Sequence, residues 1–239
     1  MIGSSMRMAY RISKMNALST NFTFSHISTS LDNLSCFNLE LKSMKILGLV
    51  KTSTVDYPKK IVATIFLGYC NLSCEYCHNK ELINPQESMT SITEEELLKF
   101  LISRKNILEG ICITGGEATL SGVELINLVD KIREQMGENF SIKLDTNGTN
   151  PKFLEKYLEK FDYIAMDFKT LYYEKYLNCS EQNILESLNV LKNGTTPYEI
   201  RITMYPSYIN EEAFVEIAET LKGVKKVFIQ QYKVVEGAS

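Results

Sequence analysis

The sequence has no apolar run that approaches the roughly 18 residues needed for a membrane-spanning helix. It also lacks a strong excess of one charge, because 26 Lys and Arg stand against 29 Asp and Glu for a formal net charge of −3. That balance gives no general reason to expect binding to nucleic acid. We therefore expect neither a membrane nor a nucleic acid as a partner.

The first 43 residues lack early acidic residues and an apolar core. No acid precedes Asp32, whereas Arg7, Arg11 and Lys14 are present and Ser, Asn, Thr and Met are frequent. Without an apolar core this stretch is not a secretory signal. Two interpretations stay open, a weak organelle-type transit peptide and an extension upstream of the folded domain. We predict an extension (1–43), a single domain (44–239) and a cytoplasmic protein.

From residue 44 onward, strand and helix patterns alternate. Apolar segments typical of buried parallel strands occupy 61–68, 110–114, 140–146, 163–169, 198–206 and 225–232. Helical patterns lie between them: after the capping residue Thr93, over 125–136 with Gly137 at the end, over 151–160 and 183–193, and after Asn210. This alternation predicts an α/β fold with parallel strands. Six strands are too few for a closed eight-stranded barrel, so we expect a partial (β/α)6 TIM-like barrel whose site lies at the carboxyl ends of the strands.

Three of the six cysteines crowd into the stretch GYCNLSCEYCHN, residues 68–79. Such clustering does not resemble a secreted disulfide framework and indicates a metal in a reduced compartment. A structural zinc site normally has four protein ligands and no open position. His78 directly follows Cys77, which is too close in sequence for a typical zinc finger. The other cysteines, Cys36, Cys112 and Cys179, form no pair, and we expect Cys112 and Cys179 to be small buried apolar residues.

Two further interpretations of the cysteine loop remain. Residues 74–78 fit the covalent haem pattern C-x-x-C-H, but haem attachment belongs in exported proteins and leaves Cys70 unexplained. An iron–sulfur cluster uses thiolates, and a complete 4Fe–4S cluster takes four. Cys70, Cys74 and Cys77 would leave one iron open to a small molecule, to which the cluster can pass an electron. The spacing favours this third interpretation.

Polar residues follow several of the other predicted strands. In TGGEAT (114–119), two glycines let the backbone approach a ligand and the acid offers an anionic acceptor. LDTNG (144–148) and MDFK (166–169) each end a strand, where their aspartates either form part of a site or cap the next turn. Arg201 lies in an apolar strand and needs a partner, either a nearby acid or a bound carboxylate. Lys169 is either functional or a solvated surface residue.

The spacing C-x3-C-x2-C with Tyr76 before the last cysteine resembles the radical S-adenosylmethionine (SAM) superfamily. The resemblance implies a 4Fe–4S cluster on Cys70, Cys74 and Cys77 and SAM as the second cofactor. It further implies that SAM is cleaved reductively to a 5′-deoxyadenosyl radical that abstracts hydrogen. The glycine-rich turn then implies a contact with the methionine amino group by Gly115, Gly116 and Glu117.

The order of CNLSCEYCHN, TGGEAT, LDTNG, AMDFK and RITMYP is similar to that of the glycyl-radical-enzyme activases, and GLVKTSTVDYP favours those that activate anaerobic ribonucleoside-triphosphate reductase. The resemblance places Asp145, Thr146, Met166 and Asp167 around a cation, Lys169 near the protein substrate and Arg201 on the SAM carboxylate. It implies a glycyl radical enzyme as partner and a flavodoxin- or ferredoxin-like electron donor. Alternatives are a radical SAM enzyme acting on a small molecule or peptide, and a non-catalytic metal-binding module. Some activases carry a cofactor-contacting histidine near the last strand, where this chain has Gln230, Gln231 and Tyr232.

Overall fold

The computed structural model describes residues 8–9 and 43–232. Its strands form a single sheet in the order β1-β8-β7-β6-β5-β4-β3-β2. Their bounds are β1 Met8–Ala9, β2 Ile46–Ser53, β3 Val62–Leu67, β4 Gly110–Gly115, β5 Ser141–Thr146, β6 Tyr163–Asp167, β7 Tyr198–Met204 and β8 Val227–Gln231. Strands β3 to β8 pair in parallel, which confirms the six predicted strands, and β1 and β2 pair antiparallel at the two edges.

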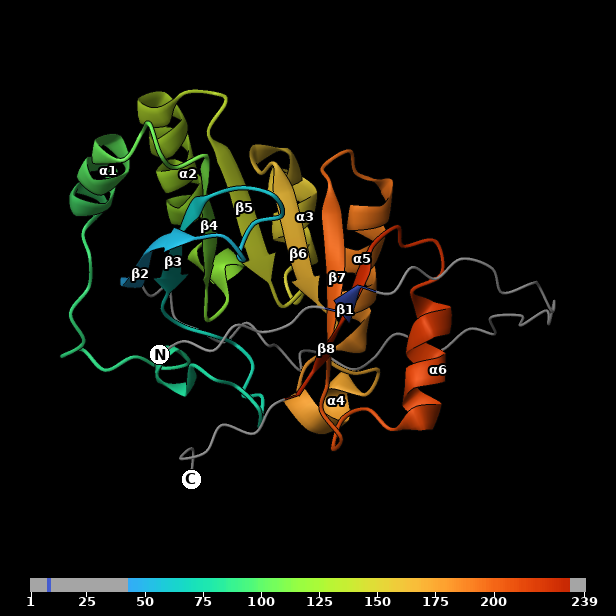
Figure 1. Ribbon diagram of the computed structural model, residues 1–239. Helices are drawn as coiled ribbons and strands as arrows, with labels where there is room; N and C mark the ends of the chain where they lie inside the picture. The colour runs from blue at the N-terminus through green and yellow to red at the C-terminus, as the bar shows by residue number, and fades with distance from the viewer. Residues whose placement is uncertain (1–7, 10–42, 233–239) are drawn as a thin grey trace.

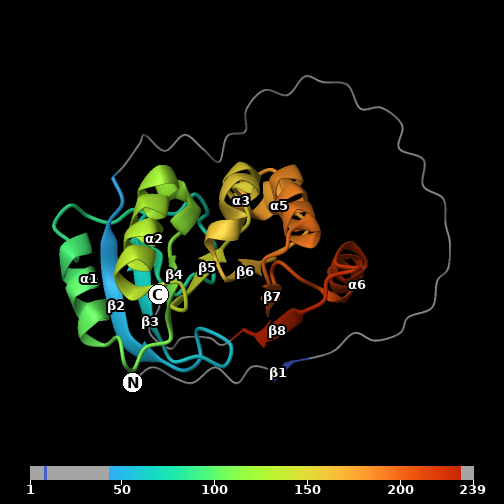
Figure 2. The ribbon, with the colours of Figure 1, turned by 90° about the horizontal axis from the view of Figure 1, so that it is seen from above.

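The helices cover the outer face of the curved sheet, as Figure 2 shows for α2, α3 and α5, with α1 and α6 beyond its two ends. Their bounds are α1 Glu94–Ser103, α2 Gly122–Met136, α3 Pro151–Tyr157, α4 Tyr173–Leu177, α5 Glu181–Asn193 and α6 Glu211–Thr220. Three short 3-10 turns add η1 Lys80–Leu82, η2 Ala118–Ser121 and η3 Leu158–Lys160. The sheet stays open because β1 and β2 end it, so the fold is the expected partial barrel.

The predicted helix ends are confirmed. Thr93 forms a complete capping box with Glu96, and the N–H of Gly137, at φ +87°, donates to the carbonyl of Arg133. Asn210 accepts a hydrogen bond from the N–H of Ala213 at 2.8 Å. These caps fix where each crossover helix starts or stops, and therefore where the following strand enters the sheet.

From residue 43 onward, the edge strand β2 and the short helix α4 were not predicted, and neither were the short 3-10 turns; β1 lies in the predicted extension. The register of β2 against β3 shifts twice, between Ile46 and Gly48 and between Val50 and Ser53, so its sequence carries no clean alternation. Helix α4 lies near the carboxyl ends of the strands (Figure 1). The prediction for residues 1–43 lies outside the described residues except at β1.

Candidate active site

The carboxyl ends of the parallel strands enclose a cavity of about 450 Å³. Its walls are the loop after β3 and the ends of β4 to β8. Most of the predicted site residues line it: Cys70, Cys74, Tyr76, Cys77, Gly115, Gly116, Asp145, Thr146, Asp167, Lys169 and Arg201. Glu117 and Met166 do not line the cavity. Its other lining residues are Leu72, His78, Asn79, Ile83, Thr114, Asn147, Thr203, Gln230, Gln231 and Tyr232.

The cysteine loop leaves β3 through a sharp turn. Tyr69 adopts φ +72°, in the left-handed region, and its N–H donates to the carbonyl of Leu82 at 2.7 Å. The N–H of Cys70 donates to the carbonyl of Ile83 at 3.1 Å. Further along, the N–H of Cys77 donates to the carbonyl of Cys74 at 3.1 Å. These bonds fold the loop back on itself, so that its three thiols reach the same cavity.

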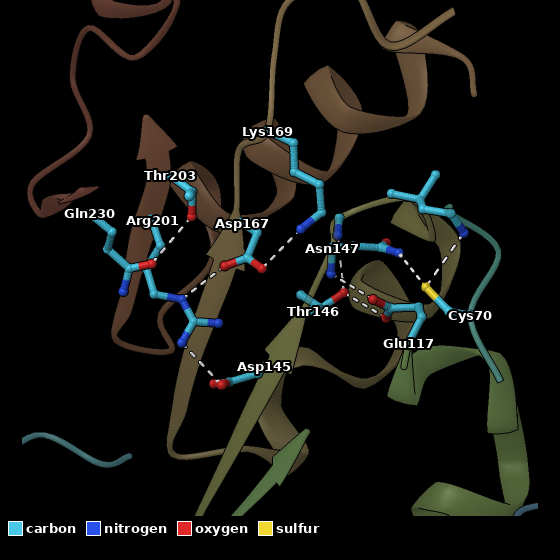
Figure 3. Close-up of polar contacts among 12 residues, drawn as sticks. Cys70, Glu117, Asp145, Thr146, Asn147, Asp167, Lys169, Arg201, Thr203 and Gln230 are labelled. Carbon is cyan, nitrogen blue, oxygen red and sulfur yellow. Dashed lines mark hydrogen bonds and ion pairs between the residues drawn. The ribbon is translucent and has the colours of Figure 1, made fainter. Parts of the chain in front are cut away.

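Side chains from the turn after β5 hold the loop from outside. The amide nitrogen of Asn71 donates to the hydroxyl of Thr149 at 2.8 Å, and the amide nitrogen of Asn147 donates to the Asn71 side-chain oxygen at 3.0 Å. Asn147 also points its amide toward Cys70 Sγ at 3.9 Å (Figure 3). Sequence reasoning missed these contacts, because Asn71 lies between two cysteines of the motif without belonging to it.

The thiols fit a cluster better than a single ion. Among the residues that the structure describes, no three His, Cys, Asp or Glu side chains form a site for one metal ion. A 4Fe–4S cluster does not require such a site, because each thiolate binds a different iron. Burial raises the pKa of the Cys70 thiol to about 12, and coordination to iron is what replaces such a proton. The Leu72 N–H, 3.4 Å from Cys70 Sγ, is already placed to stabilise a ligating sulfur.

The two glycines at the end of β4 permit close contact with the chain around the cysteine loop. A Cβ at Gly115, which has φ +127°, would lie 2.2 Å from the backbone of Leu67. A Cβ at Gly116 would lie 2.0 Å from the carbonyl oxygen of Tyr69. That same carbonyl accepts the Glu117 N–H at 2.8 Å. The glycines are therefore needed for packing as well as for lining the cavity.

Replacing Gly116 with alanine is expected to cost about 3 kcal/mol or more of unfolding free energy, because the added methyl group meets backbone that cannot rotate away. Urea denaturation of the apoprotein measures this loss. The matched control is Gly137→Ala, where no atom lies within 4 Å and only the φ of +87° opposes a side chain, so about 1 kcal/mol is expected. Equal losses in the two variants would contradict the packing argument.

The carboxylate of Glu117 joins the β4 turn to the β5 turn. Its Oε1 accepts from the Thr119 N–H and hydroxyl at 3.2 and 2.6 Å and from the Thr146 hydroxyl at 2.8 Å, and its Oε2 accepts from the Asn147 N–H at 2.5 Å. Glu117 is only 1% exposed. Burial raises its pKa, although these hydrogen bonds oppose the shift. The acid expected to receive an amino group thus lies behind the cavity wall, where it aligns two turns.

Met166 also lies behind the wall. Its side chain is fully buried and packs beneath Gly148, where a Cβ would meet Met166 Cε at 2.5 Å. Thr146 lines the cavity, but its hydroxyl donates to Glu117 and accepts the N–H of Gly148 at 3.1 Å. The Thr146 oxygen therefore has only one acceptor position left, and the Met166 side chain, which carries no oxygen, does not reach the cavity.

Charged side chains from three neighbouring strands form one connected chain across the cavity (Figure 3). Arg201 donates from Nε to Asp167 Oδ1 at 2.9 Å and from Nη1 to Asp145 Oδ2 at 3.1 Å. Lys169 Nζ lies 3.1 Å from Asp167 Oδ2. Arg201 Nη2 makes no hydrogen bond or ion pair among the described residues, so the guanidinium has one edge left for a ligand. Both interpretations of Arg201 therefore remain compatible: it pairs with acids and can still bind a carboxylate.

These ion pairs keep the two carboxylates ionised. Burial alone would raise the pKa of Asp167, but Arg201 and Lys169 lower it to about 2. The pKa of Asp145 likewise falls below its ordinary value, because Arg201 and Lys143 outweigh the effect of burial. Lys143 was not predicted as a site residue, although it lies on β5 two positions before Asp145 and therefore on the same face.

Tyrosine rings build the side of the cavity next to the cysteines. The Tyr76 ring packs 5.0 Å from that of Tyr205 and 5.6 Å from that of Tyr208, measured between centroids. The Tyr208 hydroxyl accepts the Glu75 N–H at 3.1 Å. Lys169 Nζ lies 5.8 Å from the centroid of Tyr76, within cation–π range. Tyr76 lines the cavity, and Tyr205 and Tyr208 support it from behind.

Comparison with known proteins decides the family. The family model described as the radical SAM superfamily matches residues 64–221. The chain belongs to the radical SAM superfamily. A glycyl-radical enzyme activating enzyme of Methanocaldococcus jannaschii is 34% identical over 199 residues, covering 78% of this chain and 79% of that protein. The pyruvate formate-lyase-activating enzyme of Clostridium pasteurianum is 26% identical, covering 78% of each.

Solved structures agree on the radical SAM fold. Streptococcus suis SuiB bound to S-adenosylmethionine superposes with a TM-score of 0.54 at 17% identity, covering 71% of this chain and 40% of that one. The SAM-bound structure of anSMEcpe gives a TM-score of 0.53 at 18% identity, covering 72% of this chain and 52% of that one. This chain spans less than two thirds of either protein, so the likeness concerns the shared partial barrel. The activating-enzyme relatives support an enzyme of the activase class. No helix among the described residues is long and apolar enough to cross a membrane.

Proposed function

We propose that the chain activates a glycyl radical enzyme, using a 4Fe–4S cluster and SAM to take a hydrogen atom from a backbone glycine of its partner. The observation that carries this proposal is the meeting of three thiols, a close-packed glycine turn and a connected chain of charges in one cavity. The resemblance of the sequence to the activases and the names of the relatives support it.

Each wall of the cavity has a part in this proposal. Cys70, Cys74 and Cys77 would hold three irons and leave the fourth open to the amino and carboxylate groups of SAM. Arg201 would bind the carboxylate through its free Nη2, while the Gly115–Gly116 backbone would face the amino group. When bound, the cluster would supply the electron for reductive cleavage of SAM, which would provide the radical that removes the glycine hydrogen. Docking of the partner over the open side of the cavity would keep water away from the reaction.

The partner and the electron source are finer proposals. GLVKTSTVDYP favours anaerobic ribonucleoside-triphosphate reductase as the partner, whereas several relatives are pyruvate formate-lyase-activating enzymes. A flavodoxin- or ferredoxin-like protein would supply the electron. Lys169, with its ammonium beside Asp167 and Tyr76, is the residue that we place nearest the incoming glycine loop. Such an enzyme would work in the cytoplasm.

The deciding experiment uses the full chain, reconstituted anaerobically with iron and sulfide. It is incubated with SAM and dithionite in two separate reactions, one containing anaerobic ribonucleotide reductase and the other pyruvate formate-lyase. Electron paramagnetic resonance then looks for a glycine-centred doublet, and chromatography measures 5′-deoxyadenosine. A doublet with the reductase alone supports the proposed partner, and a doublet with the lyase alone corrects it.

Two other outcomes would overturn the proposal. Cleavage of SAM without a glycyl radical on any partner would favour a small-molecule or peptide substrate. Stoichiometric zinc, with no broad visible absorption from an iron–sulfur cluster, would favour a metal-binding module without catalysis.

A further inference from the structure

Lys143 carries a charge inside the barrel, and the proposed reaction assigns it no role. The side chain is fully buried, and its ammonium pairs with Asp145 Oδ1. Its other polar neighbour is Cys112 Sγ at 3.7 Å, also fully buried. An isolated ammonium in such a place is unfavourable, and a charge of this kind persists where it is paired. Asp145 is therefore the group that Lys143 serves.

The charges of this connected group do not balance, and Glu199, which also acts on Arg201, is itself paired with Lys226 at 3.5 Å. Asp145 and Asp167 provide two negative charges, and Lys143, Arg201 and Lys169 provide three positive ones. The connected group therefore has an excess of one positive charge beside the free edge of Arg201. A ligand carboxylate placed there would neutralise the group. Without Lys143 the group would already be neutral and would attract a carboxylate less strongly.

The cation that the resemblance implies among Asp145, Thr146, Met166 and Asp167 does not fit these residues. One oxygen of Asp145 faces the Lys143 ammonium, and the other faces Arg201. Asp167 is likewise shared between Arg201 and Lys169. The Thr146 hydroxyl is engaged with Glu117, and the Met166 side chain is buried. A metal ion at Asp145 would have to displace either the Lys143 ammonium or the Arg201 guanidinium.

We infer that the Lys143 ammonium takes the place of the expected cation: it offsets the charge of Asp145, so that Arg201 keeps a net attraction for the carboxylate of SAM at its Nη2 while it stays paired with both aspartates. The part of this inference that concerns SAM rests on the proposed function. The part that concerns the cation does not, because it can be measured on the apoprotein. Lys143 is a positioning residue, since it acts on the ligand only through Asp145 and Arg201.

The first test compares potassium chloride, sodium chloride and N-methylglucamine chloride at equal ionic strength. The melting temperature of the wild-type apoprotein is expected to be the same in all three. In Lys143→Met, potassium or sodium is expected to raise the melting temperature by about 2 °C or more relative to N-methylglucamine, because Asp145 then accepts a metal ion. Lys152→Met, an exposed substitution on α3, is the matched control and should show no such response.

The second test measures SAM binding to the reconstituted protein by anaerobic equilibrium dialysis. Lys143→Met is expected to bind SAM about tenfold or more weakly in N-methylglucamine, and to recover part of that loss in potassium or sodium. The double variant Lys143→Met, Asp145→Asn removes both charges together, so it is expected to fold even where the single variant does not. Lacking the carboxylate, it should not respond to alkali cations.

Three results would overturn the inference. The first is a wild-type apoprotein that melts at a higher temperature in potassium or sodium than in N-methylglucamine. The second is a Lys143→Met protein that binds SAM as the wild type does without alkali cations, and the third is a double variant that still responds to them. If wild-type protein fails to bind SAM at all, the proposed function fails instead, and the melting data still decide the role of Lys143.

Discussion

Replacing Cys74 with serine is expected to abolish reductive cleavage of SAM. The expected loss is at least about a thousandfold, because losing a group that only orients a metal ligand already costs roughly 10–100-fold. The fold should survive, since the loop bond at this position uses the carbonyl of Cys74 and not its side chain. Production of 5′-deoxyadenosine under dithionite measures cleavage, and the iron and sulfide content measures cluster assembly.

Cys179→Ser is the matched control for this experiment. Cys179 is buried like Cys74 but does not line the cavity, so its replacement should leave cleavage and iron content unchanged. A Cys74→Ser protein that still forms 5′-deoxyadenosine at the wild-type rate would remove Cys74 from the ligand set.

Replacing Arg201 with methionine is the second change with a large expected effect. It leaves Asp145 without one of its two buried partners, and breaking a buried ion pair in this way costs about 3–5 kcal/mol of unfolding free energy. SAM affinity should fall at least about a hundredfold, because the guanidinium edge that would hold the carboxylate is lost. Urea denaturation and equilibrium dialysis measure the two effects separately.

The pH dependence distinguishes this mechanism from general damage. In the wild type the pKa values of both aspartates lie below their ordinary value, so the stability they contribute is complete above about pH 5 and is lost as the pH falls toward 2. In Arg201→Met, burial is no longer outweighed and the same pKa values should rise. The loss of unfolding free energy relative to the wild type should then be largest at neutral pH. It should shrink on mild acidification, because the carboxylates of the variant take up protons.

Arg133→Met serves as the control for Arg201. Arg133, on α2, pairs with Asp162 at 2.6 Å, and neither residue lines the cavity. Its replacement should therefore reduce stability without changing SAM affinity. If Arg201→Met bound SAM as tightly as Arg133→Met does, the proposed carboxylate contact would be wrong.

How far the sequence predicts the molecule depends on whether a feature is local. The six parallel strands follow from apolar segments, and the caps at Thr93, Gly137 and Asn210 follow from single residues beside them. The edge strand β2 was missed because it lies at the border of the sheet, with half-buried positions and a shifted register. The short α4 has too few residues for a periodic pattern to be recognised.

The site divides in the same way. Arg201 could be selected because a charge in an apolar strand needs a partner, and the same argument applies to Lys143, two residues before Asp145 in SIKLDT. The role of Glu117 could not be derived, because two of its partners, Thr146 and Asn147, come from a different strand and its turn. Motifs indicate which side chains meet at the strand ends, but not which of them face the cavity.

The hydrogen bonds that hold the cysteine loop from outside have a consequence for its repair. Asn71 and Asn147 brace the loop through Thr149, and the Tyr69 and Cys70 amides anchor its start to Leu82 and Ile83. Because none of these bonds involves iron, we expect the loop to keep its conformation without the metal, in contrast to a zinc finger, which unfolds without its ion. We therefore expect that a protein whose cluster has been destroyed by oxygen can assemble a new one without refolding of the loop.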